Sequence, residues 1–281
     1  MDANRRVIAV CGHEAAYGAA LHDLAETGTT VVRDGRGLFR TVTALARRGE
    51  ESCVVPMTLG RDPELVADTA RTLRALPPAA RARTLLTEPF GTAQHLTAWL
   101  RAAAGRAPGA AALLVTAPAG DPFEDAELYR VASLVRRYGS HELVEVAFTG
   151  GDPGPAEGVR RCLLLGAREV VLVPAAFARP PLPDVPGARI TDGGPLLSPA
   201  ALGRVLAERV ADARRHRAEH GDDGIAAGLT AADHHGHAHT HPPGEGHPHG
   251  HGHGHPHGAV HTHPHPHPHV HGAGRVIRST A

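Results

Sequence analysis

Short apolar runs alternate with longer segments of helical periodicity along the first 220 residues of the chain. Apolar runs bounded by turn residues indicate buried strands, and apolar positions three and four residues apart indicate helices that bury one face. In the first half, we expect strands at 6–10, 29–32, 53–57 and 83–86, and helices at 14–26, 36–48, 63–76 and 92–104. The second half repeats this order, with strands expected at 111–116, 143–148, 169–174 and 188–191, and helices at 124–137, 155–165 and 199–214.

This alternation predicts an α/β fold in which parallel sheets carry helices on both faces. The two halves also match each other in register. Val7 corresponds to Leu113, and Leu96 to Leu202, both at a spacing of 106 residues. We therefore predict two similar doubly wound parallel-sheet lobes, a class in which ligands bind beyond the carboxyl ends of the strands.

The composition changes near residue 220, where Gly, Pro and His replace the Ala, Leu, Val and Arg that dominate before it. Such a segment cannot bury enough apolar surface to offset the entropy of ordering it. We expect an N-terminal lobe at 1–108, a C-terminal lobe at 109–220 and a disordered, metal-binding tail at 221–281.

Charge and composition narrow the function. The 281 residues carry 29 basic and 29 acidic side chains, so nothing suggests a nucleic-acid or membrane-surface partner. Every basic residue is arginine, which excludes P-loop nucleotide hydrolases and Schiff-base lysine enzymes, and no nucleotide is expected. The three cysteines lie far apart, so the sequence suggests no disulfide framework. The apolar runs are too short to span a bilayer. We expect a cytoplasmic protein.

His13 is the first candidate functional residue. It follows the first expected strand at the start of the next helix, where α/β proteins commonly bind ligands. The zinc-protease pattern HExxH is absent, because Tyr17 stands where the second histidine would be. The alternative is a histidine that only hydrogen-bonds to the backbone at a helix start. His22, His95 and His141 are expected to be structural.

The segment after the third strand offers further candidates at the same sheet edge. Asp62 could ligate a metal, and Arg61 could pair with substrate carboxylates. A simpler interpretation of Asp62 is an N-cap, because Pro63 follows it at the first helical position. The two roles are compatible.

The tail contains 17 of the 23 histidines, most of them alternating with Gly, Pro, Ala, Thr or Val. In an extended chain, alternate residues lie on the same side, so several imidazoles can reach one ion. Imidazole suits Ni, Cu, Zn and Co, and it is mostly neutral at pH 7. The alternative is a solubilising low-complexity segment. The predicted metal ligands here are His235, His237, His239, His241, His247, His249, His251, His253, His255, His257, His261, His263, His265, His267, His269 and His271.

The stretch from Leu114 to Pro174 carries a family resemblance. It contains Gly120-Asp121-Pro122, then Val144-Glu145-Val146-Ala147-Phe148, then Leu165-Gly166-Ala167-Arg168 before a valine-rich strand. This order and spacing resemble the second lobe of the CbiX/SirB-type class II sirohydrochlorin chelatases. Members have one or two βα lobes, and some carry histidine-rich segments. With the internal repeat, the resemblance covers about residues 5–215.

The resemblance implies insertion of a divalent metal ion into a sirohydrochlorin-type tetrapyrrole. Co²⁺ insertion in cobalamin synthesis is favoured, with Ni²⁺, Fe²⁺ or Zn²⁺ as further candidates. The family's metal-handling histidine follows the first strand in a Gly-His-Gly-Ser context. Here Gly12-His13 matches, but Glu14-Ala15 follows. The second family histidine follows the third strand, where this chain has Asp62, and the corresponding second-lobe loop, Thr116-Ala117-Pro118, has no histidine.

In this interpretation, His13 holds the incoming ion, assisted by Asp62 or by a substrate nitrogen, and accepts a proton from a pyrrole nitrogen. Arginines on the cleft loops would bind the substrate's peripheral carboxylates. The candidates are Arg33, Arg36 and Arg61.

A chelatase of this kind would be a lyase. Two other functions are alternatives to it. One is a non-catalytic descendant that stores or delivers metal, as the missing second histidine and the long tail suggest. The other is an unrelated two-lobe protein that binds a polyanionic small molecule without metal dependence.

Overall fold

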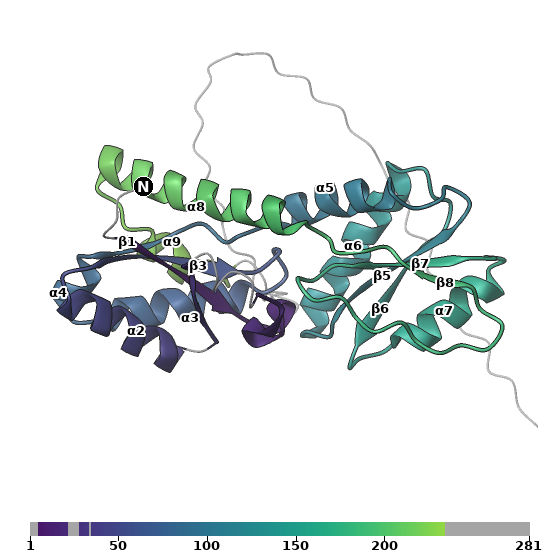
Figure 1. Ribbon diagram of the computed structural model, residues 1–281, viewed down its shortest axis with the longest axis horizontal. Helices are drawn as coiled ribbons and strands as arrows, with labels where there is room; N and C mark the ends of the chain where they lie inside the picture. Colours follow the sequence, from purple (N-terminus) through teal and green to yellow (C-terminus); the bar gives the residue numbers. More distant parts are fainter. Residues whose placement is uncertain (1–4, 22–27, 34, 234–281) are drawn as a thin grey trace, which may run out of the picture. The chain divides into compact units, whose positions relative to one another are not determined.

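The computed structural model describes residues 5–21, 28–33 and 35–233, which contain two parallel β-sheets (Figure 1). The first sheet has the strand order β2-β1-β3-β4, and the second has the order β6-β5-β7-β8. Every strand pairing is parallel, which confirms the predicted two-lobe α/β fold. The strands are β1 (Arg5–Cys11), β2 (Thr30–Val32), β3 (Glu51–Met57), β4 (Thr84–Leu86), β5 (Ala112–Pro118), β6 (Val144–Thr149), β7 (Val170–Pro174) and β8 (Ile190–Asp192).

Eight α-helices connect and cover these strands in the described part of the chain. Several begin with an acidic or hydroxyl N-cap followed by proline, as at Asp62-Pro63, Asp121-Pro122 and Ser198-Pro199. The helices are α2 (Gly35–Arg47), α3 (Pro63–Arg74), α4 (Pro78–Arg81), α5 (Ala93–Ala104), α6 (Pro122–Arg137), α7 (Pro155–Leu164), α8 (Pro199–His220) and α9 (Ile225–Leu229).

The two halves exchange a helix. Helix α5 precedes the second sheet in sequence and packs against α6 and β7 of that half. Helix α8 follows the second sheet and returns to pack against β3 and β4 of the first, as Figure 1 shows. One apolar core accordingly includes Met57, the last residue of β3, together with Leu100 of α5 and Leu206 of α8. The expected boundary at residue 108 therefore does not separate two independent cores, and both sheets fall in one compact unit.

The region after the first strand differs from the expected helix at 14–26. Residues His13–Leu21 form η1, a stretch of 3₁₀ turns broken in the middle. Ala16 and Tyr17 have positive φ angles of 48° and 52°, a left-handed conformation that non-glycine residues rarely adopt. Residues 22–27, including His22, lie outside the described residues. Neither position is a glycine or proline, so nothing in the sequence at Ala16 or Tyr17 signals this break.

The expected disordered tail begins later than residue 221. Helix α9 follows α8 and packs against α3 and β4. The backbone N–H of Leu86 donates to the Asp223 carbonyl at 2.8 Å, and Ile225 is only 5% exposed. Residues 221–233 therefore belong to the fold, and the expectation of disorder there was wrong. The predicted tail ligands from His235 to His271 lie outside the described residues.

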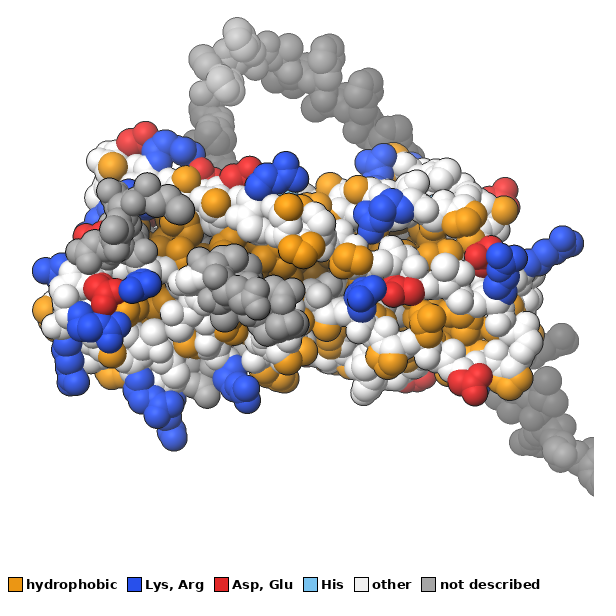
Figure 2. Space-filling model, viewed as in Figure 1, with side chains coloured by type: hydrophobic (Ala, Val, Ile, Leu, Met, Phe, Trp, Pro, Cys, Tyr) orange, Lys and Arg blue, Asp and Glu red, His pale blue; other side chains and the backbone are white. Residues whose placement is uncertain are grey.

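None of the described helices combines the length and apolar character needed to cross a bilayer. On the face seen in Figure 2, arginine and acidic side chains are scattered among apolar and neutral ones instead of gathering by sign.

Candidate metal-binding site

His13 lies just beyond β1, at the sheet edge where β1 and β3 both end. The two strands pair in register from Arg5 opposite Glu51 to Cys11 opposite Met57. Gly12 is needed at this point, because a Cβ there would overlap the Asp62 carboxylate. The strand register and this glycine bring the segment after β1 against the segment after β3.

Asp62 has both of the roles that the sequence left open. Its Oδ1 accepts a hydrogen bond from the backbone N–H of Leu65 at 2.8 Å, which caps α3. Its Oδ2 lies 3.1 Å from Nδ1 of His13. The cap fixes the carboxylate, and the fixed carboxylate orients the imidazole.

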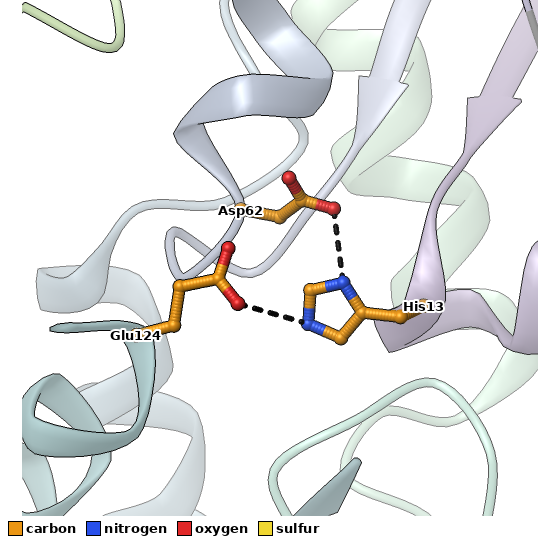
Figure 3. Close-up of side chains that lie close together, drawn as sticks. All are labelled: His13, Asp62 and Glu124. Carbon is orange, nitrogen blue, oxygen red and sulfur yellow. Dashed lines mark ion pairs between the residues drawn. The ribbon is translucent and has the colours of Figure 1, made fainter. Parts of the chain in front are cut away.

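Glu124 completes the site from helix α6 in the second half of the chain, as Figure 3 shows. Its Oε2 lies 3.5 Å from Nε2 of His13 and accepts a hydrogen bond from the backbone N–H of Asp121 at 3.1 Å. The Asp121 side chain in turn accepts from the Glu124 N–H, so a capping box holds Glu124 in the first turn of α6. Sequence reasoning missed Glu124. The signal present was an Asp-Pro helix start after β5 that matches Asp62-Pro63 after β3.

The three side chains form a candidate ion site. Their potential ligand atoms all lie within 4.8 Å of one another. The side chains of Asp62 and Glu124 are 10% exposed and that of His13 is 18% exposed. Nε2 of His13 is buried and makes no hydrogen bond within the described structure. One imidazole with two carboxylates suits a divalent transition-metal ion such as Zn²⁺, Fe²⁺, Co²⁺ or Mn²⁺.

The environment shifts the pKa of both groups that face each other across this site. Burial alone lowers the pKa of His13, but the hydrogen bond and charge of Asp62, together with the charges of Glu14 and Glu124, outweigh burial, so its pKa is raised. Burial raises the pKa of Glu124 to about 7, against the opposing charge of His13. Glu124 therefore exchanges a proton near neutral pH, and His13 holds its proton more tightly than an ordinary histidine does. A bound cation would displace both protons.

A buried carboxyl supports the segment that bears Asp62. Glu14 is fully buried, and its Oε2 accepts hydrogen bonds from the Thr58 hydroxyl and, at 3.0 Å, from the Leu59 N–H. The Thr58 oxygen accepts from the backbone N–H groups of Gly60 at 3.0 Å and Asp62 at 3.1 Å. Burial raises the pKa of Glu14. Glu14 thus holds the loop after β3 in the shape that presents Asp62.

Arg61 does not occupy the place expected of a substrate ligand. Its side chain is fully buried, and it pairs with Asp125 at 3.0 Å. A guanidinium in this position is not offered to a tetrapyrrole carboxylate, so the predicted role of Arg61 does not fit. Arg33 and Arg36 are exposed near the end of β2 and outside the His13 cluster, and their substrate role stays a prediction.

The other described histidines weighed in the sequence, and Cys11 beside His13, have structural surroundings. His141 is buried, with its ring nitrogens 2.9 Å and 3.0 Å from the carbonyl oxygens of Ala111 and Ala104. His95 takes part in the capping box that starts α5. Burial raises the pKa of the Cys11 thiol to about 12, so it does not supply a thiolate near His13.

A cavity of about 820 Å³ adjoins Asp62, between the loops after β3 and β4 and the helices α8 and α9. More carboxylates than arginines line it. The acidic residues include Glu88, Asp212, Glu219, Asp222 and Asp223, and the arginines are Arg209 and Arg215. This charge favours small cations over a polycarboxylate ligand.

The fold and this site define a two-lobe α/β protein with a candidate divalent-metal centre at the carboxyl ends of its strands. No protein-family model matches the sequence, and no curated protein matches it significantly. Two enzymes are among the solved structures that match. One is the sirohydrochlorin chelatase SirB from Bacillus subtilis subspecies spizizenii in complex with cobalt, with 13% identity, 78% of this chain and 99% of that chain covered, and a TM-score of 0.46. The other is CbiX, described as the terminal enzyme for biosynthesis of siroheme in denitrifying bacteria, with 19% identity, 75% and 99% coverage, and a TM-score of 0.40.

Proposed function

We propose that this protein is a chelatase that inserts a divalent metal ion into a sirohydrochlorin-type tetrapyrrole. The observation that carries the proposal is the His13 imidazole set between the carboxylates of Asp62 and Glu124, at the ligand-binding edge of the sheets. The substrate class comes from the resemblance of the segment Leu114–Pro174 to the chelatase pattern.

Each residue of the site has a defined task in this mechanism. Asp62 accepts the hydrogen bond from Nδ1–H of His13, which leaves Nε2 as the nitrogen that faces the ion. Glu124 supplies a carboxylate oxygen on the same side of the ring. The ion is a substrate, so this small ligand set must hold it and then release it to the four pyrrole nitrogens.

The proton balance of insertion fits the two raised pKa values. The tetrapyrrole loses two protons from its inner nitrogens as it gains the dication. As the ion leaves, His13 Nε2 and the Glu124 carboxylate are freed, and each can take one of these protons. The raised pKa values of both groups favour proton acceptance, and that of Glu124 lies at about 7. The site thereby exchanges one dication for two protons with no net change of charge.

The finer parts of the proposal concern the metal, the tail and the cell compartment. We propose Co²⁺ as the ion and cobalamin synthesis as the setting, while Ni²⁺, Fe²⁺ and Zn²⁺ share the donor preferences of the site. The histidine-rich segment would raise the local metal concentration through its tether. The compartment that we propose is the cytoplasm, because the three cysteines lie far apart in the sequence, as is common in proteins of a reducing compartment.

A non-catalytic metal-delivery protein is the second candidate. The acidic lining of the cavity beside Asp62 favours it, because that surface attracts cations and repels the carboxylates of a tetrapyrrole. This function needs the ion site and the tail but no arginine-lined substrate surface.

A spectrophotometric insertion assay with sirohydrochlorin and Co²⁺, run on the full chain, separates the two. A chelatase accelerates the spectral change above the uncatalysed rate, and His13→Ala and Glu124→Gln each lower the rate about 100-fold or more. His220→Ala, an exposed imidazole at the end of α8, is the matched control and keeps full rate. Metal binding that needs His13, with no acceleration of insertion, would favour the delivery protein.

A further inference from the structure

Arg61 connects the two halves of the chain at the ion site. It leaves the loop after β3, and its side chain reaches the first turn of α6 in the other half. Its Nε donates to the Glu124 carbonyl oxygen at 3.2 Å, and its Nη2 donates to Asp125 Oδ1 at 3.0 Å. The residue's exposed fraction is only 1%. This guanidinium therefore has a fixed position and defined partners.

The helical turn to which Arg61 donates these hydrogen bonds is the turn that carries Glu124. Asp125 Oδ1 also accepts from the Gly120 N–H at 3.0 Å, so the carboxylate joins the end of β5 to the guanidinium. Nη2 lies 3.5 Å from the Pro118 carbonyl oxygen in the same segment. Arg61 thus contacts both sides of the connection from β5 to α6, and Glu124 lies within it.

The ion site depends on this connection because its ligands come unequally from the two halves. His13 and Asp62 both follow strands of the first sheet, whereas Glu124 alone comes from the second. Gly60 fixes the path of the loop that holds Arg61 and Asp62. Its φ is 99°, and a Cβ there would overlap the backbone at Thr92 and Ala93. The loop therefore presents one side chain to His13 and the next to α6.

We propose that Arg61 is a positioning residue that places Glu124 against His13, so that the ion site is complete only while the Arg61–Asp125 ion pair holds. The proposal rests on the proposed function only in requiring that the three side chains bind a cation. Lysine is not equivalent to arginine here, because its compact ammonium lacks the planar guanidinium whose separate Nε and Nη2 donate to the Glu124 carbonyl and to Asp125.

The test measures binding of Mn²⁺ to the full chain by the electron paramagnetic resonance signal of the free ion. Mn²⁺ is the suitable probe because it accepts carboxylate ligands and has the weakest affinity for imidazole sites among the first-row divalent ions, which suppresses the tail's contribution. Arg61→Lys and Asp125→Asn are each expected to weaken Mn²⁺ binding about tenfold, as loss of a residue that supports a metal ligand does.

Non-additivity separates a role through Glu124 from general damage. The double variant Arg61→Lys with Glu124→Gln is expected to bind Mn²⁺ as weakly as Glu124→Gln alone. Arg130→Ala is the matched control, because it removes an exposed ion pair with Glu127 on the same helix and leaves Mn²⁺ affinity unchanged. Thermal unfolding followed by circular dichroism checks that each variant is folded. If Arg61→Lys does not fold, Asp125→Asn decides, because Asp125 is 25% exposed and Asn retains an acceptor oxygen.

The outcomes distinguish this proposal from the one on which it rests. Loss of Mn²⁺ binding in His13→Ala together with wild-type affinity in Arg61→Lys and Asp125→Asn would overturn the positioning role alone. Additive losses in the double variant would overturn it too, because Arg61 would then act independently of Glu124. Wild-type Mn²⁺ affinity in His13→Ala would show that the three side chains do not form the ion site, and it would overturn both proposals.

Discussion

Nε2 of His13 and Oε2 of Glu124 lie 3.5 Å apart although the two residues are 111 positions apart in sequence and follow strands of different sheets. The ion site is therefore built from residues of both halves of the chain. Any change in the packing between the halves therefore changes the ligand set, which gives the exchanged helices α5 and α8 a functional consequence.

The affinity of the site for metal is expected to rise with pH. Its ligand atoms must lose their protons to bind a cation, and the pKa values of His13 and Glu124, the latter about 7, are both raised. Mn²⁺ affinity of the full chain should increase at least about tenfold from pH 6 to pH 8. In a weakly buffered titration, Glu124→Gln should release about one proton fewer per bound ion. A pH-independent affinity would contradict the assignment of these ligands.

Replacing Glu124 should change how stability depends on pH in the absence of metal. The pKa of Glu124 is about 7 in the folded protein against an ordinary value of 4.5, so the folded state holds this proton more tightly. The stability that the proton contributes is fully present below pH 4.5 and is lost as the pH rises through 7.

Glutamine is neutral throughout this range and does not lose that contribution. Between pH 5 and pH 8, Glu124→Gln should gain about 2 kcal/mol in free energy of unfolding relative to the wild-type protein, after allowance for solvent screening. Urea unfolding at the two pH values, with a chelator present, measures the difference. A constant gap between the two proteins would refute the raised pKa.

Variants of Asp62 should separate its cap from its contact with the imidazole. Asp62→Asn keeps an oxygen that can accept from the Leu65 N–H and loses the negative charge beside His13. We expect it to retain most of the wild-type stability but to weaken metal binding about tenfold. Asp62→Ala should weaken binding as well and also cost about 1 kcal/mol of stability through the lost cap. Equal stability of the two variants would show that the cap contributes nothing.

Helix α9 is expected to stabilise the first sheet. Ile225 is buried against the core that includes Leu86, and truncation to alanine at such a site costs about 2 kcal/mol or more. Ala226→Ser on the exposed side of α9 is the control and should change stability little. A chain ending after His220 should melt at a lower temperature than one ending after Asp233. Identical melting temperatures would mean that α9 adds no stability.

The sequence by itself determined most of the local structure and two of the three residues of the candidate site. Apolar periodicity located the strands and most of the helices, and the Asp62-Pro63 signal correctly marked a helix start, because both depend on neighbours along the chain. The sequence placed His13 and Asp62 at the same edge of a parallel sheet, because each follows one of its strands, and only the structure showed that the two side chains meet.

Only the tertiary structure decided the contacts between segments that are far apart in the sequence. The return of α8 to the first sheet, the docking of α9 on β4, the approach of Glu124 to His13 and the burial of Arg61 all join segments far apart in sequence. No periodicity or spacing encodes such contacts, because they depend on which surfaces fit once the elements exist. An arginine in a loop looks like a solvent-facing ligand in the sequence, and only the packing of α6 over it turned it into a buried connection between the halves.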